Sequence, residues 1–206
     1  MWQPTYIALG DSLTAGRGDP DEHGRPIGWA RRLSSLLAER TGVQYEFTNL
    51  AVDQATIVEV LAEQMPVLVG EHPDLVTIST GINDIRGAFN ADEFASRIDG
   101  AFADAASTGA LVATMTLPNI VSNSPLPKEL LDVARTYMEQ LNEAIRRSAH
   151  VYGALLIDAW YTDEAAEPAF WSADHMHPNA HGHQVIAQAF ADLLCSSNML
   201  SRAPGI

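Results

Sequence analysis

The chain has 206 residues, of which 47% are hydrophobic and 18% are charged. This composition is typical of a globular protein and excludes the low-hydrophobicity class of disordered chains, and the length favours one domain over residues 1–206. The formal net charge of −14 argues against nucleic acid as a partner, because binding to phosphates requires clustered Lys and Arg side chains.

Cys195 is the one cysteine, so the chain can form neither an internal disulfide nor a thiolate metal cluster. A lone cysteine in an apolar run is expected to be a buried structural thiol. No apolar run reaches the ~20 residues that span a bilayer, so no stable membrane association is expected. No signal-peptide pattern precedes the first predicted strand. We therefore expect a cytoplasmic protein, with the reservation that a leader removed beforehand leaves no trace.

Five short runs rich in β-branched and apolar residues have the length and composition of strands. They cover residues 6–9, 45–48, 75–78, 111–114 and 155–157. Each is followed by a loop and a longer stretch with helical spacing of apolar residues. These stretches cover residues 28–40, 57–69, 92–107, 128–152 and 179–194. Strands that alternate with helices predict a parallel sheet covered on both faces, which is a three-layer α/β/α sandwich.

Chemically capable side chains follow several of these predicted strands. Residues 10–12 (Gly-Asp-Ser) follow the first strand, Asn49 the second, residues 81–84 (Gly-Ile-Asn-Asp) the third, and residues 174–177 (Asp-His-Met-His) lie after the fifth. In open parallel sheets, ligands bind outside the carboxyl ends of the strands. We therefore expect the functional site at this edge of the sheet.

A serine, a histidine and an aspartate in these segments have the chemistry of a catalytic triad. A serine hydroxyl is a weak nucleophile unless a base takes its proton, and that base works best when a third group fixes its tautomer. Asp174 precedes His177 by three residues, so a tight turn would bring its carboxylate to Nδ1 and leave Nε2 facing Ser12. Pro178 and the N-cap candidate Asn179 would hold His177 at a rigid corner. The spacing alone is equally compatible with Ser12 as a helix cap and His177 as a solvated loop residue.

Ester chemistry also requires hydrogen-bond donors for the oxyanion of the transition state. The backbone N–H of Ser12 and the side-chain amide of Asn83 are the candidates. Asn83 is also compatible with a structural role, because asparagine beside glycine and aspartate is common in turns.

In order and spacing, these segments resemble the sequence blocks of the SGNH hydrolases, also called GDSL esterases and lipases. The resemblance rests on residues 10–14, 49, 81–84 and 174–179 and extends from residue 6 to about residue 194. It implies a flavodoxin-like α/β/α sandwich with sheet order 2-1-3-4-5. It also implies a serine esterase that hydrolyses small-molecule carboxylic esters through an acyl-serine, without a metal or an organic cofactor.

The resemblance also implies roles for individual residues. Ser12, Asp174 and His177 take the triad positions, and Asn83 and the Ser12 amide take two oxyanion-hole positions. Three further charged residues of these blocks are expected to be structural, the two carboxylates by accepting backbone hydrogen bonds: Asp11, Asp84 and Arg86.

One block departs from the family pattern. After the asparagine at position 49 the family usually has Ser-Gly, whose glycine N–H is a third oxyanion donor, and here the corresponding residues are Asp53 and Gln54. The Gln54 backbone amide would remain a donor at negative φ, whereas a positive φ would strain a glutamine. A carboxylate beside an oxyanion is unfavourable, so Asp53 is expected to point away or to be paired. We expect activity to be retained with an altered substrate preference.

Other functions are compatible with parts of the sequence. Removal of O-acetyl groups from sugars or metabolites, thioester hydrolysis and acyl transfer would all use the same nucleophile. A non-catalytic α/β binding protein would result if the change at Asp53 and Gln54 marked lost activity.

A zinc site is not expected, because His181 and His183 are two residues apart on a predicted helix and point in different directions. The other members of that histidine-rich stretch are His175 and His177.

The surroundings of the site can only be outlined from the sequence. Irregular segments at residues 18–27, 118–126 and 162–170 are expected to form its rim. The aromatic residues nearby are expected to cover the end of the core rather than to line an acyl pocket; they are Trp160, Tyr161, Phe170 and Trp171. No sequence feature indicates an oligomeric state.

Overall fold

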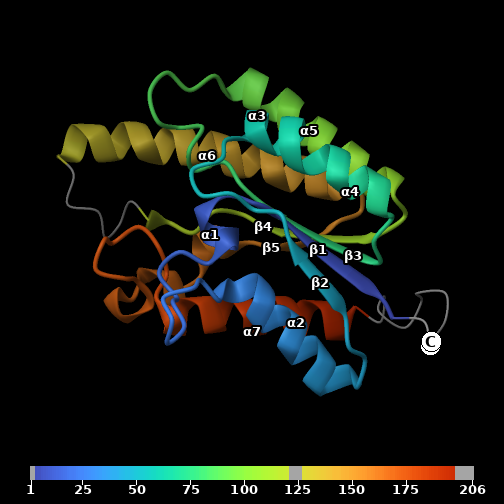
Figure 1. The fold of residues 1–206 in the computed structure, drawn as a ribbon. Helices are drawn as coiled ribbons and strands as arrows, with labels where there is room; N and C mark the ends of the chain where they lie inside the picture. Colours follow the sequence, from blue (N-terminus) through green and yellow to red (C-terminus); the bar gives the residue numbers. More distant parts are fainter. Residues whose placement is uncertain (1–2, 121–126, 198–206) are drawn as a thin grey trace.

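The computed structural model describes residues 3–120 and 127–197, which form a parallel β-sheet with helices on both faces (Figure 1). The strands are β1 (Thr5–Gly10), β2 (Glu46–Asn49), β3 (Leu75–Ser79), β4 (Leu111–Met115) and β5 (Leu155–Ile157). Their order is β2-β1-β3-β4-β5, and all neighbours are parallel. The predicted three-layer architecture and strand order are confirmed.

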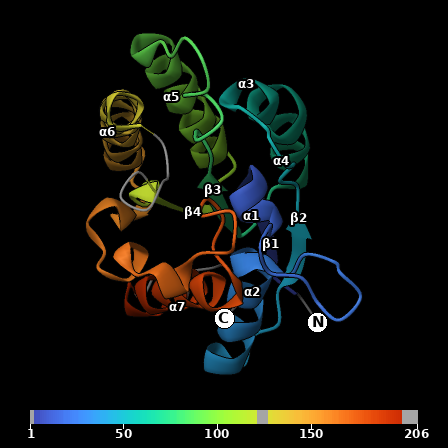
Figure 2. The ribbon, with the colours of Figure 1, turned by 90° about the vertical axis from the view of Figure 1, so that its left-hand side faces the viewer.

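Two helix layers bury the two faces of the sheet. On one face, α2 (Gly28–Thr41) and α7 (Ala180–Ser196) lie side by side (Figures 1 and 2), and Trp29 stacks on Phe190 with ring centroids 4.7 Å apart. On the other face lie α5 (Ala91–Ser107) and α6 (Lys128–Val151). Alternate residues of β1 enter the two cores, as a strand in a doubly covered sheet requires.

The helix predicted over residues 57–69 is present but is not uniform. It consists of α3 (Ile57–Glu59), a π-helical turn η1 (Val60–Gln64) and α4 (Met65–Glu71). At the end of the π turn, the buried side chain of Gln64 accepts from the N–H of Gly10 and donates to its carbonyl, both at 2.9 Å. Strand β2 pairs with β1 only as far as Ala8. Beyond that point Gln64 bonds to both polar groups of Gly10, and the N–H of Val52 also donates to the Gly10 carbonyl at 3.2 Å.

The carboxyl ends of the strands lie together at one edge, which faces the viewer in Figure 2. The short helix α1 (Ser12–Ala15) starts directly after β1 and lies in the middle of this edge, between the two helix layers. After β5, three 3₁₀ turns lead towards α7: η3 (Ala159–Tyr161), η4 (Glu164–Ala166) and η5 (Pro168–Phe170). Segments from both ends of the chain therefore meet at the expected site.

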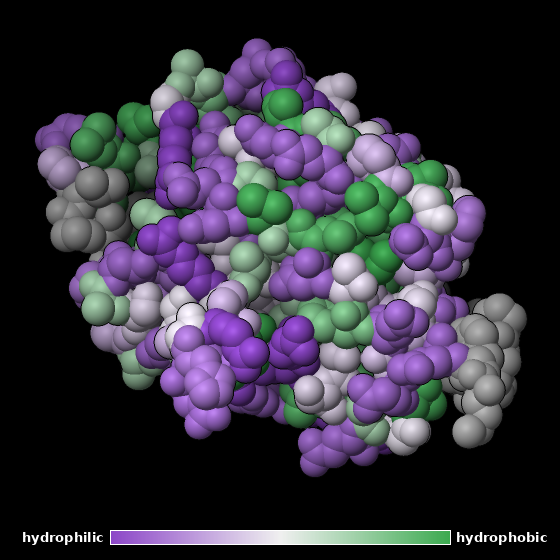
Figure 3. Space-filling view, viewed as in Figure 1, coloured by the Kyte–Doolittle hydropathy of each residue, from purple (hydrophilic) through white to green (hydrophobic). Residues whose placement is uncertain are grey.

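The surface seen in Figure 3 is mostly hydrophilic, and apolar side chains gather around α4. The exposed apolar residues of α3 and α4 are Val58, Val67 and Val69. Within residues 3–120 and 127–197, no helix has both the length and the apolar character needed to cross a bilayer. Cys195 lies in the last turn of α7 and is half-buried, so the expectation of a buried thiol is wrong.

We predict that Gln64→Ala lowers the free energy of unfolding by about 2–3 kcal/mol, because it leaves the buried N–H of Gly10 unpaired and opens a cavity. The exposed neighbour Glu63 provides the control, since Glu63→Ala should change the free energy by no more than about 0.5 kcal/mol. Urea unfolding followed by circular dichroism measures both. Equal stability of the two variants would show that the hydrogen bonds between Gln64 and Gly10 do not stabilise the fold.

Candidate active site

Ser12 is held at the first position of α1 by the geometry at the end of β1. Gly10 has a φ of 147°, and a Cβ at this position would lie 2.0 Å from the carbonyl oxygen of Ser79, so the position requires glycine. Asp11 caps α1, since its Oδ1 accepts from the N–H of Leu13 at 3.0 Å. The result is a serine on a tight strand-to-helix turn, with only 4% of its surface exposed.

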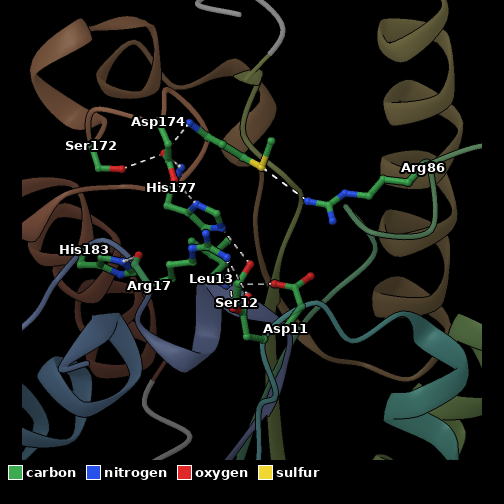
Figure 4. Close-up of polar contacts among 11 residues, drawn as sticks. Asp11, Ser12, Leu13, Arg17, Arg86, Ser172, Asp174, His177 and His183 are labelled. Carbon is green, nitrogen blue, oxygen red and sulfur yellow. Dashed lines mark hydrogen bonds and ion pairs between the residues drawn. The ribbon is translucent and has the colours of Figure 1, made fainter. Parts of the chain in front are cut away.

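The structure brings Ser12, His177 and Asp174 together in the arrangement that the sequence predicts (Figure 4). Nε2 of His177 lies 3.0 Å from the Ser12 hydroxyl, and Nδ1 lies 2.7 Å from Oδ2 of Asp174. Because a carboxylate only accepts, Nδ1 carries the proton and Nε2 accepts from the hydroxyl. This is the tautomer in which an imidazole can take the proton of a serine.

Asp174 is fixed by several donors. Its Oδ1 accepts from the N–H groups of Met176 and His177, each at 3.0 Å, and from the hydroxyl of Ser172 at 2.8 Å. Partial burial acts to raise the pKa of Asp174, but the bonds from the His177 amide and imidazole, with those from Met176 and Ser172, hold it well below its usual range. The carboxylate therefore stays ionised in mildly acidic solution.

His177 occupies the rigid corner that the sequence predicts. Its carbonyl accepts from the N–H of Ser172 at 2.8 Å. Asn179 is the N-cap of α7, and its Oδ1 accepts from the N–H groups of His181 at 2.9 Å and Gly182 at 3.1 Å. The imidazole thus has little freedom, which suits a group that must face Ser12.

Three N–H donors were expected to form an oxyanion hole: the backbone N–H of Ser12, the side-chain amide of Asn83 and the backbone N–H of Gln54. The buried Asn83 donates one Nδ2 hydrogen to the carbonyl of Ala55 at 3.0 Å. Its second Nδ2 hydrogen and the backbone N–H groups of Ser12 and Gln54 have no acceptor among the residues that the structure describes. These donors remain available to a ligand.

Gln54 has a φ of 69°, so the strained alternative considered for this position is the one observed. The left-handed conformation costs a residue with a side chain about 1–2 kcal/mol. Asp53 forms an ion pair with Arg17, whose guanidinium lies 3.0 Å from Oδ2. The expectation that Asp53 is paired or points away is therefore confirmed.

Two further carboxyl groups of the motifs organise loops, as expected. Asp11 caps α1, and Asp84 accepts from the N–H of Ile57 at 3.1 Å. Burial raises the pKa of Asp84 to about 6. Burial also raises the pKa of Asp11 to about 7; the bond from Leu13 opposes this rise and the neighbouring Asp84 adds to it. Near neutral pH, Asp11 therefore carries only part of a negative charge beside Ser12.

The remaining motif residues connect segments of the site. Nδ2 of Asn49 donates to the carbonyl of Thr14 at 2.8 Å, and its Oδ1 accepts from the N–H of Ala51 at 3.0 Å. This ties the loop after β2 to α1. The guanidinium of Arg86 lies 3.7 Å from the sulfur of Met176 (Figure 4). Arg86 thus contacts the segment that carries His177, in line with a structural role.

A small apolar pocket of about 30 Å³ opens beside Ser12 and His177. Its apolar wall includes Leu13, Ile82, Leu117, Ile120, Met138 and Trp171. Leu117 is fixed by the buried Asn142, which accepts from its N–H at 2.8 Å and donates to its carbonyl at 3.0 Å. The sequence did not lead us to Asn142 or Met138 as residues of the site. Asn142 could have been recognised, because it is a polar residue next to Leu141 on the apolar face of a predicted helix.

The four aromatic residues near the site differ in burial: two are buried, one is half-buried and one is exposed. Phe170 and Trp171 are buried in the core, as expected, and Trp171 also lines the pocket beside Ser12. Trp160 is half-buried against the other core, whereas Tyr161 is 76% exposed and so departs from the expectation. Of the expected rim segment 118–126, residues 118 and 120 line the pocket, and residues 121–126 lie outside the described part of the chain.

The histidine-rich stretch does not form a metal site in the described ranges, where no group of three or more His, Cys, Asp or Glu side chains is placed to hold a metal ion. Both ring nitrogens of the buried His183 are used: Nδ1 accepts from the N–H of Trp29 at 3.1 Å, and Nε2 donates to the carbonyl of Arg17 at 2.9 Å. His181 follows Asn179 in the first turn of α7.

Comparison with known proteins finds similarity over most of the chain. Residues 8–185 match the GDSL-like lipase/acylhydrolase family. A GDSL-like esterase of Mycobacterium tuberculosis is 25% identical over 186 residues, which cover 88% of this chain but only 58% of that protein. An acetylxylan esterase of Geobacillus stearothermophilus is 23% identical over 204 residues, which cover 89% of this chain and 90% of that protein.

The fold agrees as well. An α/β hydrolase enzyme from the metagenome of Lake Arreo, Spain, has a TM-score of 0.74 with this chain at 24% identity, over 92% of this chain and 94% of that one. Since the family match spans most of the sequence, from β1 into α7, the chain belongs to the GDSL-like lipase/acylhydrolase (SGNH hydrolase) family.

Proposed function

We propose that this protein hydrolyses small esters of short carboxylic acids, with Ser12 as nucleophile, His177 as general base and Asp174 as the group that orients the imidazole. The observation that carries the proposal is the continuous chain of hydrogen bonds, with 3.0 Å from Ser12 to Nε2 and 2.7 Å from Nδ1 to Asp174. Membership of an acylhydrolase family supports the reaction type.

The reaction proceeds in two balanced steps. Ser12 Oγ attacks the ester carbonyl carbon while its proton passes to Nε2 of His177, and the imidazolium then protonates the departing alcohol as the ester C–O bond breaks. Water next attacks the acyl-Ser12, gives its proton to His177, and the acid leaves as Ser12 regains a proton. The ionised Asp174 stabilises the imidazolium in both steps.

The negative oxygen formed in each step is assigned to three donors: the backbone N–H of Ser12, the side-chain amide of Asn83 and the backbone N–H of Gln54. Their lack of acceptors among the described residues supports this assignment. Donors that are fixed before the reaction act most strongly in a dry site, and Ser12 and Asn83 are both buried.

The size of the pocket supports a short acyl group. About 30 Å³ is two to three times the ~10–15 Å³ that one ordered water requires on the same measure. An acetyl or propionyl group therefore fits beside Ser12. A second apolar cavity of about 150 Å³ shares Pro118 with the first and would serve a longer chain if the two were joined.

Removal of acetyl groups from an acetylated sugar or metabolite is the more specific candidate within this proposal. The small apolar pocket favours it, as does the similarity to a protein named acetylxylan esterase. Thioester hydrolysis or acyl transfer would use the same nucleophile with a different leaving group or acceptor.

Ser12→Ala should lower kcat/KM for p-nitrophenyl acetate by about 10³-fold or more, because no other group can form the acyl-enzyme. The exposed Ser107 provides a matched control, and Ser107→Ala should retain full turnover. A Ser12→Ala protein that is as active as wild type would exclude this mechanism. Absence of turnover in the wild type on every ester tested would favour the non-catalytic alternative.

Asp174→Asn should lower kcat by about 10²–10⁴-fold, because an amide no longer fixes the Nδ1-protonated tautomer or stabilises the imidazolium. Because the folded-state pKa of Asp174 is lowered, protonation of this group should not limit the wild-type rate at pH 5. Rates between pH 5 and 8 test both statements, with Asp163→Asn at an exposed position as control. A variant with an unchanged kcat would argue against a role for this carboxylate.

A chain-length series tests the acyl pocket. We expect kcat/KM to fall at least about tenfold from p-nitrophenyl acetate to the hexanoate, since each misplaced methylene is costly in a closed pocket. Ile120→Ala should enlarge the pocket and raise the hexanoate-to-acetate ratio, whereas Leu130→Ala at an exposed position of α6 should not. Acetylated sugars and an acyl thioester belong in the same assay. A wild-type preference for hexanoate would refute the short-acyl assignment.

A further inference from the structure

The turn that carries Gln54 is strained and tied down on both sides. Gln54 has a φ of 69°, in a region that glycine adopts far more readily than glutamine. The N–H of Val52 donates to the carbonyl of Gly10 at 3.2 Å, and the N–H of Ala55 donates to Val52 at 3.1 Å. The carbonyl of Ala55 accepts from Asn83 at 3.0 Å. None of these bonds involves the peptide between residues 53 and 54, which carries the third candidate donor.

Arg17 lies in the turn after α1 and contacts the side chain of Asp53, the residue before this peptide. One of its guanidinium nitrogens lies 3.0 Å and 3.4 Å from the two carboxylate oxygens of Asp53. The backbone of Arg17 is itself fixed, because its N–H donates to the carbonyl of Ser12 at 3.0 Å and its carbonyl accepts from Nε2 of the buried His183 at 2.9 Å (Figure 4). Asp53 is thus tethered to a segment whose position is set relative to the nucleophile.

We propose that Arg17 is a positioning residue for the reaction: by holding Asp53, it keeps the Gln54 peptide in its left-handed conformation with the N–H facing the oxyanion. This inference rests on the proposed hydrolase function. Arg17 acts through Asp53 and not on the reacting atoms. An exposed ion pair contributes little free energy, but whatever it contributes to one orientation of the peptide shifts the population towards that orientation by the same amount.

A second physical effect acts at the same place and is separable. Without Arg17, the carboxylate of Asp53 would be unpaired near a developing negative charge and would oppose it. Removal of Asp53 relieves that repulsion but also releases the peptide. Positioning therefore predicts a slower Asp53→Ala enzyme, and charge repulsion alone predicts one that is equally fast or faster.

The experiment measures kcat and KM for p-nitrophenyl acetate in Arg17→Ala and Asp53→Ala. We expect kcat to fall about threefold to fivefold in both, as the loss of an exposed ion pair allows, which is less than the ~10²–10³-fold of complete donor loss. KM should stay unchanged, because an oxyanion donor acts on the transition state and not on the bound ester. The control is Arg40→Ala, which removes an ion pair with Asp192 between exposed residues of α2 and α7 and should leave kcat unchanged.

The decisive comparison is made in a Gln54→Gly background. Glycine adopts a positive φ without a steric penalty, so adding Arg17→Ala to Gln54→Gly should leave kcat at the value of Gln54→Gly alone. A loss of stability or of local charge would instead lower kcat by the same factor in both backgrounds. This rescue identifies a positioning role.

The proposal would be overturned by a wild-type kcat in Arg17→Ala, by an equal fall in both backgrounds, or by an Asp53→Ala enzyme that is as fast as wild type or faster. Ser12→Ala, assayed alongside, separates this result from failure of the proposed function. Turnover retained in Ser12→Ala refutes the hydrolase mechanism itself, whereas turnover lost in Ser12→Ala but normal in Arg17→Ala refutes only the positioning role.

Discussion

The hydrogen bond between the His177 imidazole and the Ser12 hydroxyl is the contact on which the rest of the site depends, and it joins residues 165 positions apart. A bond of this length tolerates little displacement, so both partners must be fixed independently. Ser12 is fixed by the end of the central strand β1 and the cap of α1. His177 is fixed by Asp174 and by the N-cap of α7. The sheet and its two helix layers bring these local structures together.

Side-chain amides hold the loops of this edge where the sheet no longer can. Gln64 pairs with Gly10 beyond the last residue pair of β1 and β2, alongside the N–H of Val52. Asn142 pairs in the same two-bond manner with Leu117, beyond the end of β4. A carboxamide has a donor and an acceptor, like the backbone of a neighbouring strand. Both amides are buried, so they order the loops around Ser12 without adding a strand.

The sequence predicts the parts of this protein that depend on local pattern. The strands, most helices, and the short motifs that carry Ser12, Asn83 and His177 follow from the spacing of residues close together in the chain. The turn from Asp174 to His177 is also local, and its geometry is as predicted. Strand order and the assembly of the triad followed from the resemblance to a known family.

Features that depend on distant contacts could not be predicted. The π turn that ends at Gln64 places the amide of this residue against Gly10, and nothing near residue 64 in the sequence indicates that partner. The left-handed conformation of Gln54 and the pairing of Asp53 with Arg17 depend on where two separate loops meet. Trp171 both packs in the core and lines the pocket, a double role that periodicity does not reveal.

In the proposed mechanism, the Ser12 oxygen becomes covalently bonded to the substrate acyl group with the help of His177. Mass spectrometry after reaction with a phosphonate ester, which forms a stable adduct with an activated serine, tests it most directly. We expect a single adduct, located on the peptide that contains Ser12 and formed much more slowly in His177→Ala. An adduct on another residue, or labelling of Ser12 at an unchanged rate in His177→Ala, would contradict it.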